Sequence, residues 1–160
     1  MNKIYLLIGG NLGDRKKNIS QAENILSKAL GKIIFSSAIY ETAPWGFQHE
    51  NYFLNKAICI ETRFDAKKVL EICLQTEEKL GRKRTDGNYA ARTMDIDILF
   101  FNDELIETEH LTIPHPQLHK RKFVLAPLAE IASNLEHPVF QKRISVLLHE
   151  CSDILEVRKL

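Results

Sequence analysis

Long apolar runs are absent from the sequence. The apolar run at the N-terminus, Ile4–Ile8, stops at Gly9 and Gly10. It is far shorter than a membrane span of about 20 residues, and too short for the apolar region of a signal peptide. We therefore expect a cytoplasmic protein that does not associate with membranes.

Cysteine is scarce. Cys59, Cys73 and Cys151 stand far apart, with no C-x-x-C pair and no histidine placed to complete a zinc set. This spacing argues against a disulfide framework and a zinc site, and we expect three buried, reduced thiols.

An excess of either charge is also missing. The 22 Lys and Arg residues against 21 Asp and Glu residues leave a net charge of +1, which argues against a general nucleic-acid binder. The sequence has no G-x-x-x-x-G-K-[ST] loop, no G-x-G-x-x-G fingerprint and no protein-kinase motif. Any bound polyphosphate must therefore be held by local side-chain cations and metal ions.

What the chain does contain is enough apolar residues for one core. With 160 residues, a hydrophobic content of 44% and no internal repeat or linker, residues 1–160 are expected to form a single domain.

Hydrophobic periodicity predicts the order strand, helix, strand, strand, helix, strand. The strands are expected at 4–8, 33–40, 53–62 and 94–101, with a loop at 41–51. One helix is expected between the glycine turn at 9–13 and Gly31, with its apolar residues at 19–30, a second at 65–80, and C-terminal helical segments near 124–132 and 142–150. This order is the split βαβ plan of the α+β class, with an antiparallel sheet backed by helices on one face.

Two acids alternate with apolar residues in the strand at 94–101. The even-numbered residues from Met94 to Phe100 are expected to face one way, and Asp95 and Asp97 the other. Two carboxylates on one face lie about 6.6 Å apart along the backbone and can converge on metal ions roughly 3.5–4 Å apart. An exposed strand face that happens to carry two acids explains the pair alone equally well.

The preceding segment favours the metal-binding interpretation. Residues 81–93 carry Arg82, Lys83, Arg84 and Arg92, and the segment ends directly at the acidic strand. Metal ions and arginine forks together neutralise a polyphosphate. Because the segment has few apolar residues, we expect a mobile loop that closes on bound nucleotide, with an ordinary polar surface loop as the alternative.

Further polar and aromatic residues fit such a site. Glu77 falls in the apolar stripe of the helix at 65–80, so it needs a partner: an arginine at the rim, or the site itself. His115 and His119 have the i, i+4 spacing of zinc ligands, but Pro116 argues against a helix there and no further ligand completes the set. The rings of Trp45, Phe53 and Phe123, with Asn55 among them, can form a slot for a flat heterocycle, although such rings are more often core residues.

These segments together resemble the 6-hydroxymethyl-7,8-dihydropterin pyrophosphokinases of the folate pathway, over nearly the whole chain. The most distinctive stretch, roughly R-x-x-D-[IL]-D-[IL], occurs as Arg92–Ile98, and Leu-Thr-Ile-Pro-His follows it at 111–115. The opening Ile8–Asp14, the loop Tyr40–Gly46 and the segment Phe53–Asn55 also fit.

The resemblance implies a ferredoxin-like α+β fold and transfer of pyrophosphate from ATP to the hydroxymethyl group of the reduced pterin, with release of AMP. It implies that Asp95 and Asp97 bind two Mg²⁺ ions and act with Arg82 and Arg92 as the catalytic residues. The implied nucleotide-binding residues are Glu77, Arg84, Ile98, Thr112, His115 and Arg121. The implied pterin-binding residues are Thr42, Trp45, Phe53, Asn55 and Phe123.

Three positions depart from the family pattern. Phe53 stands where Tyr is common, Tyr89 where Trp is frequent, and His110 where an Arg can assist the phosphates. None of the three removes an expected metal ligand.

Two other function classes compete with this hypothesis. The acidic pair alone permits a magnesium-dependent phosphohydrolase or nuclease, which would release phosphate from ATP whether or not the pterin is present. A non-enzymatic RNA-binding or regulatory module lacks support, because the sequence has neither the K/R-G-F/Y aromatic motif nor a basic charge. We therefore expect small-molecule partners only, no nucleic acid, and a monomer.

Overall fold

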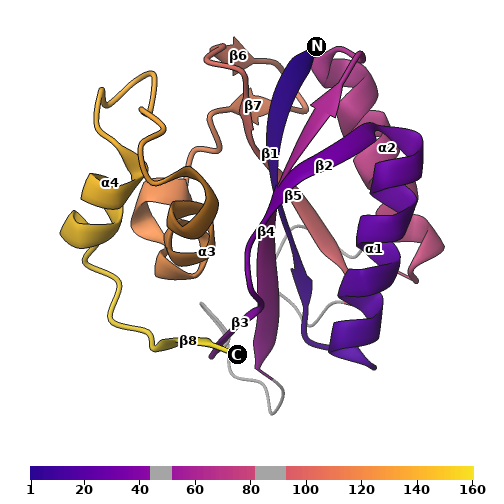
Figure 1. The fold of residues 1–160 in the computed structure, drawn as a ribbon, viewed down its shortest axis with the longest axis horizontal. Helices are drawn as coiled ribbons and strands as arrows, with labels where there is room; N and C mark the ends of the chain where they lie inside the picture. The colour runs from indigo at the N-terminus through magenta and orange to yellow at the C-terminus, as the bar shows by residue number, and fades with distance from the viewer. Residues whose placement is uncertain (44–51, 82–92) are drawn as a thin grey trace.

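The structure is a computed structural model that describes residues 1–43, 52–81 and 93–160. Its strands are β1 (Asn2–Gly10), β2 (Gly31–Ser36), β3 (Tyr40–Thr42), β4 (Phe53–Thr62), β5 (Asp95–Phe101), β6 (Ile106–Glu107), β7 (Thr112–Ile113) and β8 (Val157–Lys159). Its helices are α1 (Arg15–Ala29), α2 (Ala66–Lys79), α3 (Lys122–Ala132) and α4 (Ile144–Glu150), with a 3-10 turn η1 (Leu118–Lys120). A central sheet separates α1 and α2 on one face from α3 and α4 on the other (Figure 1).

The strand order of the central sheet is β5-β1-β4-β3-β8, with β2 also paired to β4, and every pair is antiparallel. Strand β4 therefore lies between β1 and β2, and β1 lies between β4 and β5. Both strand–helix–strand units, β1-α1-β2 and β4-α2-β5, thus have a third strand inserted in the middle. This arrangement confirms the predicted split βαβ plan of the α+β class.

Local capping explains where the first two long helices begin. Asp14 accepts a hydrogen bond from the backbone N–H of Lys17 at 3.1 Å, and Asp65 accepts one from Lys68 at 2.9 Å. The start at Asp65 agrees with the prediction. Gly31 follows the C-cap of α1 with φ +149°, a conformation that L side chains rarely adopt.

Alternation along the strands produces a hydrophobic core on each face of the sheet. Ile4, Leu6 and Ile8 of β1 pack in the cluster that includes α1 and α2. Tyr5 and Leu7 pack in the cluster that includes α3 and α4. The sheet is therefore covered on both faces, and the C-terminal helices form the second layer.

The prediction of a single strand at 33–40 is wrong. It is divided into β2 and β3, and the start of the predicted loop at 41–51 belongs to β3. The break lies at Ser37, whose hydroxyl accepts a hydrogen bond from the N–H of Ala57 at 2.9 Å. A side chain thus takes the place of a backbone acceptor of the ladder, which local propensity does not reveal.

The predicted side-chain orientations of β5 are wrong at the C-terminal end of the strand. The register shifts between Tyr5 and Leu6, so that Ile98 lies opposite Leu6 but Phe100 lies opposite Tyr5. Phe100 therefore packs against the α3 side, and Phe101 packs on the α1 and α2 side. A β-bulge reverses the alternation at the point where it occurs.

Smaller differences concern the thiols and the C-terminus. Cys59 and Cys73 are buried free thiols as predicted, whereas Cys151 is only partly buried. The last helix begins at Ile144, and strand β8 was not predicted. Within the described ranges, no helix has both the length and the apolar character that crossing a membrane requires.

Candidate active site

Three neighbouring strands place a row of residues across the sheet. Gly9 of β1 lies directly opposite Asp95 of β5 on one side and opposite Asn55 of β4 on the other. Asp97 lies two residues further along β5, opposite Leu7. Residues directly opposite each other point to the same face, and this is the face that α3 covers elsewhere. The acidic pair and the amide of Asn55 therefore belong to one surface.

Gly9 leaves room in the middle of this row. A Cβ atom added there would lie 2.3 Å from Oδ1 of Asn55 and 2.3 Å from the carbonyl oxygen of Leu54. The Asn55 amide thus lies over the backbone of β1, in space that any side chain at position 9 would fill. The sequence pattern predicts Gly9 as the end of a strand, although a glycine inside a strand also signals such a close approach.

Thr42 and Phe53 extend the surface toward β3. They lie opposite each other in the pairing of β3 with β4. Thr42 is 1% exposed, and its hydroxyl has no hydrogen-bond partner in the structure of the described segments. Because an unsatisfied buried hydroxyl costs about 1–3 kcal/mol, this group is suited to receive a polar ligand.

Arg121 and Phe123 come from the start of α3. Arg121 is the residue before the helix, is 7% exposed, and its guanidinium lies 5.8 Å from the centre of the Phe123 ring. Burial lowers the pKa of Arg121. A cation in a partly desolvated position interacts more strongly with an anion than one in water.

His115 follows the cis peptide bond between Ile113 and Pro114. Its backbone N–H donates to the carbonyl of Leu99 at 3.0 Å, which ties the turn to β5. Its Nδ1 accepts from the N–H of Gln117 at 3.1 Å, so the neutral ring carries its proton on Nε2. Burial lowers the pKa of His115, although the charge of Asp95 opposes this. The neutral imidazole can therefore donate a hydrogen bond from Nε2.

Three expected nucleotide-binding residues lie on or beyond the other face of β5. Glu77 is 3% exposed and accepts a hydrogen bond from the N–H of Ile96 at 2.8 Å, so it lies in the core and not at the rim. Ile98 is buried in the same cluster as Ile113, the neighbour of the exposed Thr112. Glu77 and Ile98 thus lie on the face of β5 opposite the row, and Thr112 lies in β7 next to Ile113.

Other expected site residues lie outside the described residues. They are Trp45, Arg82, Arg84 and Arg92, together with Tyr89 and the loop expected to close on nucleotide. Their roles remain predictions.

The acidic pair suits Mg²⁺ that arrives with a phosphate-bearing substrate. The described ranges contain no cluster of three or more His, Cys, Asp and Glu that could hold a metal ion. Asp95 and Asp97 are partly exposed, so both can take part in a shell completed by other oxygen atoms. Mg²⁺ is commonly held in this way, by one or two carboxylates, waters and substrate phosphates.

Comparison with known proteins identifies the family. Residues 5–133 match the model of the 7,8-dihydro-6-hydroxymethylpterin-pyrophosphokinase family, abbreviated HPPK. The chain belongs to the HPPK family. The 2-amino-4-hydroxy-6-hydroxymethyldihydropteridine pyrophosphokinase of Bacillus subtilis is 45% identical over 138 residues, which are 85% of this chain and 82% of the relative. The enzyme of the same name from Aquifex aeolicus is 38% identical over 142 residues, or 89% of this chain and 88% of the relative.

Solved structures support the HPPK fold. An HPPK-DHPS crystal structure in complex with substrates matches 92% of this chain with a TM-score of 0.73 and 18% identity. Wild-type Plasmodium falciparum HPPK-DHPS with pteroate matches 93% with a TM-score of 0.75 and 20% identity. This chain spans 43% and 42% of those two chains. The fold agrees with the family, and the family confirms the prediction of an ATP-dependent pyrophosphokinase.

Proposed function

We propose that the row Asp95, Gly9 and Asn55 is the place where this HPPK chain carries out its reaction. That reaction is transfer of pyrophosphate from ATP to the hydroxymethyl group of a dihydropterin, which gives the pterin diphosphate and AMP in folate biosynthesis. The row is the observation that carries the proposal. Asp95 and Asn55 are two strands apart, about 10 Å, with no side chain between them. A phosphate site and a ring site can therefore lie side by side on the same face of the sheet.

The phosphate end of this surface is formed by acids and cations. Asp95 and Asp97 would hold two Mg²⁺ ions, which neutralise phosphate charge and lower the pKa of the acceptor hydroxyl. His115 would donate from Nε2 to a phosphate oxygen, and Arg121 would pair with the triphosphate. Arg82, Arg84 and Arg92 would supply further charge, as the family resemblance implies.

The pterin end is formed by an amide, a hydroxyl and two rings. The Asn55 side chain lies over Gly9 on this surface, and both the oxygen and the NH₂ group of its amide would pair with the edge of a heterocycle. The Thr42 hydroxyl provides another polar contact. Phe53 and Phe123 would stack on the two faces of the pterin, and Trp45 would line the same slot.

The nucleotide base would lie at the edge of β5. Thr112 is exposed there and can contact a ligand directly. Glu77 and Ile98 are buried beneath it, so we assign them to shaping and holding this edge around the nucleotide.

Alignment and electrostatics account for the catalysis that these residues can provide. Phosphoryl-type transfer is accelerated mainly by in-line positioning and by stabilising charge on the phosphate oxygens. The site therefore requires no dedicated general base. We further propose that residues 1–160 act as one domain, as a cytoplasmic monomer.

An assay of AMP release tests the proposal. With ATP, Mg²⁺ and 6-hydroxymethyl-7,8-dihydropterin, AMP and the pterin diphosphate should form in equal amounts. Without the pterin alcohol, AMP release should fall to background. Release of phosphate at the same rate with and without the pterin would instead indicate a phosphohydrolase.

A further inference from the structure

The C-terminal strap, residues 151–160, lies beyond the part of the chain that matches the family model, which ends at residue 133. The strap leaves α4 and ends as β8 beside β3 (Figure 1). On the way it makes a hydrogen bond to Lys122, the first residue of α3. It therefore connects two elements that carry proposed pterin-binding residues: Phe123 on α3 and Thr42 on β3.

Asp153 of the strap caps α3 from a distance in the sequence. The residue at the N-cap position of α3 is Arg121, whose side chain makes no capping hydrogen bond. Asp153 supplies the missing acceptor: its Oδ2 accepts from the N–H of Lys122, the first residue of the helix, at 3.1 Å. Its Oδ1 accepts from the N–H of Leu155 at 3.0 Å, which fixes the carboxylate within the strap. A negative charge at a helix N-terminus is also favourable because of the helix dipole.

The other end of the strap is anchored to β3 and to α3. Val157 pairs opposite Thr42 in the ladder of β8 with β3. Lys159 forms an ion pair with Glu130 of α3 at 2.6 Å, and the N–H of Leu160 donates to the carbonyl of Ile39 at 2.9 Å. The strap is thus bonded to α3 at two places and to the β3 edge along its last residues.

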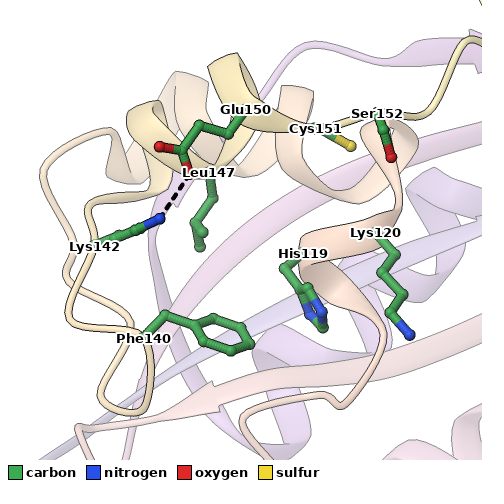
Figure 2. A pocket seen from close by; sticks show the side chains of 8 residues that line it. All are labelled: His119, Lys120, Phe140, Lys142, Leu147, Glu150, Cys151 and Ser152. Carbon is green, nitrogen blue, oxygen red and sulfur yellow. Dashed lines mark hydrogen bonds and ion pairs between the residues drawn. The ribbon is translucent and has the colours of Figure 1, made fainter.

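Open space lies behind η1, next to the residues that lead into α3. A cavity of about 370 Å³ lies between η1 and the end of α4 (Figure 2). Its lining includes His119 and Lys120 of η1, and Cys151 and Ser152 of the strap. Arg121 comes directly after Lys120, so the residues that lead into α3 border this cavity. The hydrogen bond from Lys122 to Asp153 holds the start of the helix beside it.

We propose that Asp153 is a positioning residue for pterin binding: it fixes the first turn of α3, with Arg121 and Phe123, at a set distance from Thr42. This inference rests on the proposed function, since it takes Phe123 and Thr42 as opposite parts of the pterin site. Pre-organised contacts preserve affinity because the ligand does not have to order them.

The test compares Asp153→Ala and Asp153→Asn with Glu156→Ala. Glu156 is an exposed acid in the same strap, so its replacement removes the same charge without removing the cap. We expect Asp153→Ala to raise the KM for the pterin alcohol about tenfold and the KM for ATP less than about threefold, since several other groups hold ATP. Asp153→Asn keeps a carbonyl acceptor and should give a smaller rise in the pterin KM. Glu156→Ala should leave both constants unchanged.

A second measurement follows the cap itself. Hydrogen–deuterium exchange in the first turn of α3 should become faster in Asp153→Ala than in Glu156→Ala. If Asp153→Ala does not fold, the kinetic constants and the exchange rates of Asp153→Asn test the inference instead. Kinetic constants and exchange equal to those of Glu156→Ala would overturn the inference. If the unsubstituted protein itself releases no AMP with the pterin alcohol, the proposed function fails. Faster exchange in Asp153→Ala would then still show that Asp153 stabilises the first turn of α3.

Discussion

Gly9 contributes to the site through the space that it leaves. The glycine lies inside β1, between the acidic pair and Asn55, and a Cβ atom there would overlap both the Asn55 side chain and the backbone of β4. The strands can therefore stay paired with the amide held above them only if position 9 has no side chain. A short apolar run followed by glycines reads as a strand that ends, whereas the paired strand continues to Gly10.

Gly9→Ala should damage stability and pterin binding together. The methyl group must displace the Asn55 amide or part the strands, so we expect a loss of about 1–3 kcal/mol in the free energy of unfolding. The KM for the pterin alcohol should rise at least about tenfold, because the amide moves. Denaturant unfolding and steady-state kinetics measure the two effects.

Gly31→Ala is the matched control. A Cβ atom at Gly31 would lie 2.1 Å from the carbonyl oxygen of Glu61, and Gly31 pairs with Thr62 at the other end of β4. This variant should lose stability and retain the pterin KM. An unchanged pterin KM in Gly9→Ala would contradict the arrangement of the row.

At the scale of elements, a buried carboxylate joins α2 to β5. Glu77 accepts a hydrogen bond from Ile96, the residue between Asp95 and Asp97. The side chains of Asp95 and Asp97 point to the opposite face, so the bond from Glu77 holds the strand behind them. The helical position of Glu77 indicated that it needs a partner, but the identity of that partner depends on how the helix packs.

Glu77→Ala should therefore destabilise the protein and lower turnover. Loss of the acceptor leaves a buried N–H unsatisfied, at a cost of about 1–3 kcal/mol, and gives the two aspartates more freedom. Glu77→Gln, which keeps an acceptor oxygen, should recover part of both losses. Thermal unfolding and kcat are the measurements.

The neighbouring exposed acid provides the comparison. Glu78→Ala removes the same side chain from the solvent-facing side of α2, so stability and kcat should stay near those of the unsubstituted protein. Equal effects of the two substitutions would contradict the role of Glu77.

Elements with local signals were predictable from the sequence, and elements that depend on distant partners were not. The start of α2 at Asp65 follows from a capping side chain and an apolar stripe, which are local. The break at Ser37 depends on a hydrogen bond to Ala57, and β8 depends on a place beside β3. The same limit applies to the cap of α3, because Asp153 lies 31 positions from Lys122.

For the whole molecule, the sequence was most informative where chemistry requires particular residues. The acidic pair, its spacing and the Leu-Thr-Ile-Pro-His segment identified the family, and the order of elements identified the fold. How the site residues are distributed over the faces of the sheet depends on register. Gly9 shows this, since its importance becomes visible only once Asp95 and Asn55 are known to lie on either side of it.

At the scale of the whole molecule, we expect the buried ring of His137, in the core beside α3 and α4, to make stability sensitive to acid. The ring is 3% exposed, and its Nδ1 accepts from the N–H groups of Val139 and Phe140, each at 3.2 Å. Burial, with a smaller effect of His119, lowers the pKa of His137 from its ordinary value of 6.5 to about 4. The unfolded chain therefore takes up a proton at a higher pH than the folded protein does, so the stability that His137 contributes is complete above pH 6.5 and is lost as the pH falls toward about 4.

We predict that the melting temperature falls between pH 7 and pH 4, and that His137→Gln reduces this fall by at least about 3 °C. His137→Gln should also be less stable at pH 7, since it disturbs the bonds to Val139 and Phe140. His149→Gln, at an exposed histidine, should keep the pH dependence of the unsubstituted protein. An unchanged slope in His137→Gln would show that other groups cause the acid sensitivity.

The most direct measurement of the central claim is turnover of the two single variants Asp95→Asn and Asp97→Asn in the AMP-release assay with ATP, Mg²⁺ and the pterin alcohol. Each substitution removes one carboxylate charge from the phosphate end of the row and keeps its size, so each should lower kcat at least about 10³-fold with little change in melting temperature. Asp103→Asn, at an exposed acid after β5, should leave kcat unchanged. Turnover near that of the unsubstituted protein in either Asp95→Asn or Asp97→Asn would contradict the account.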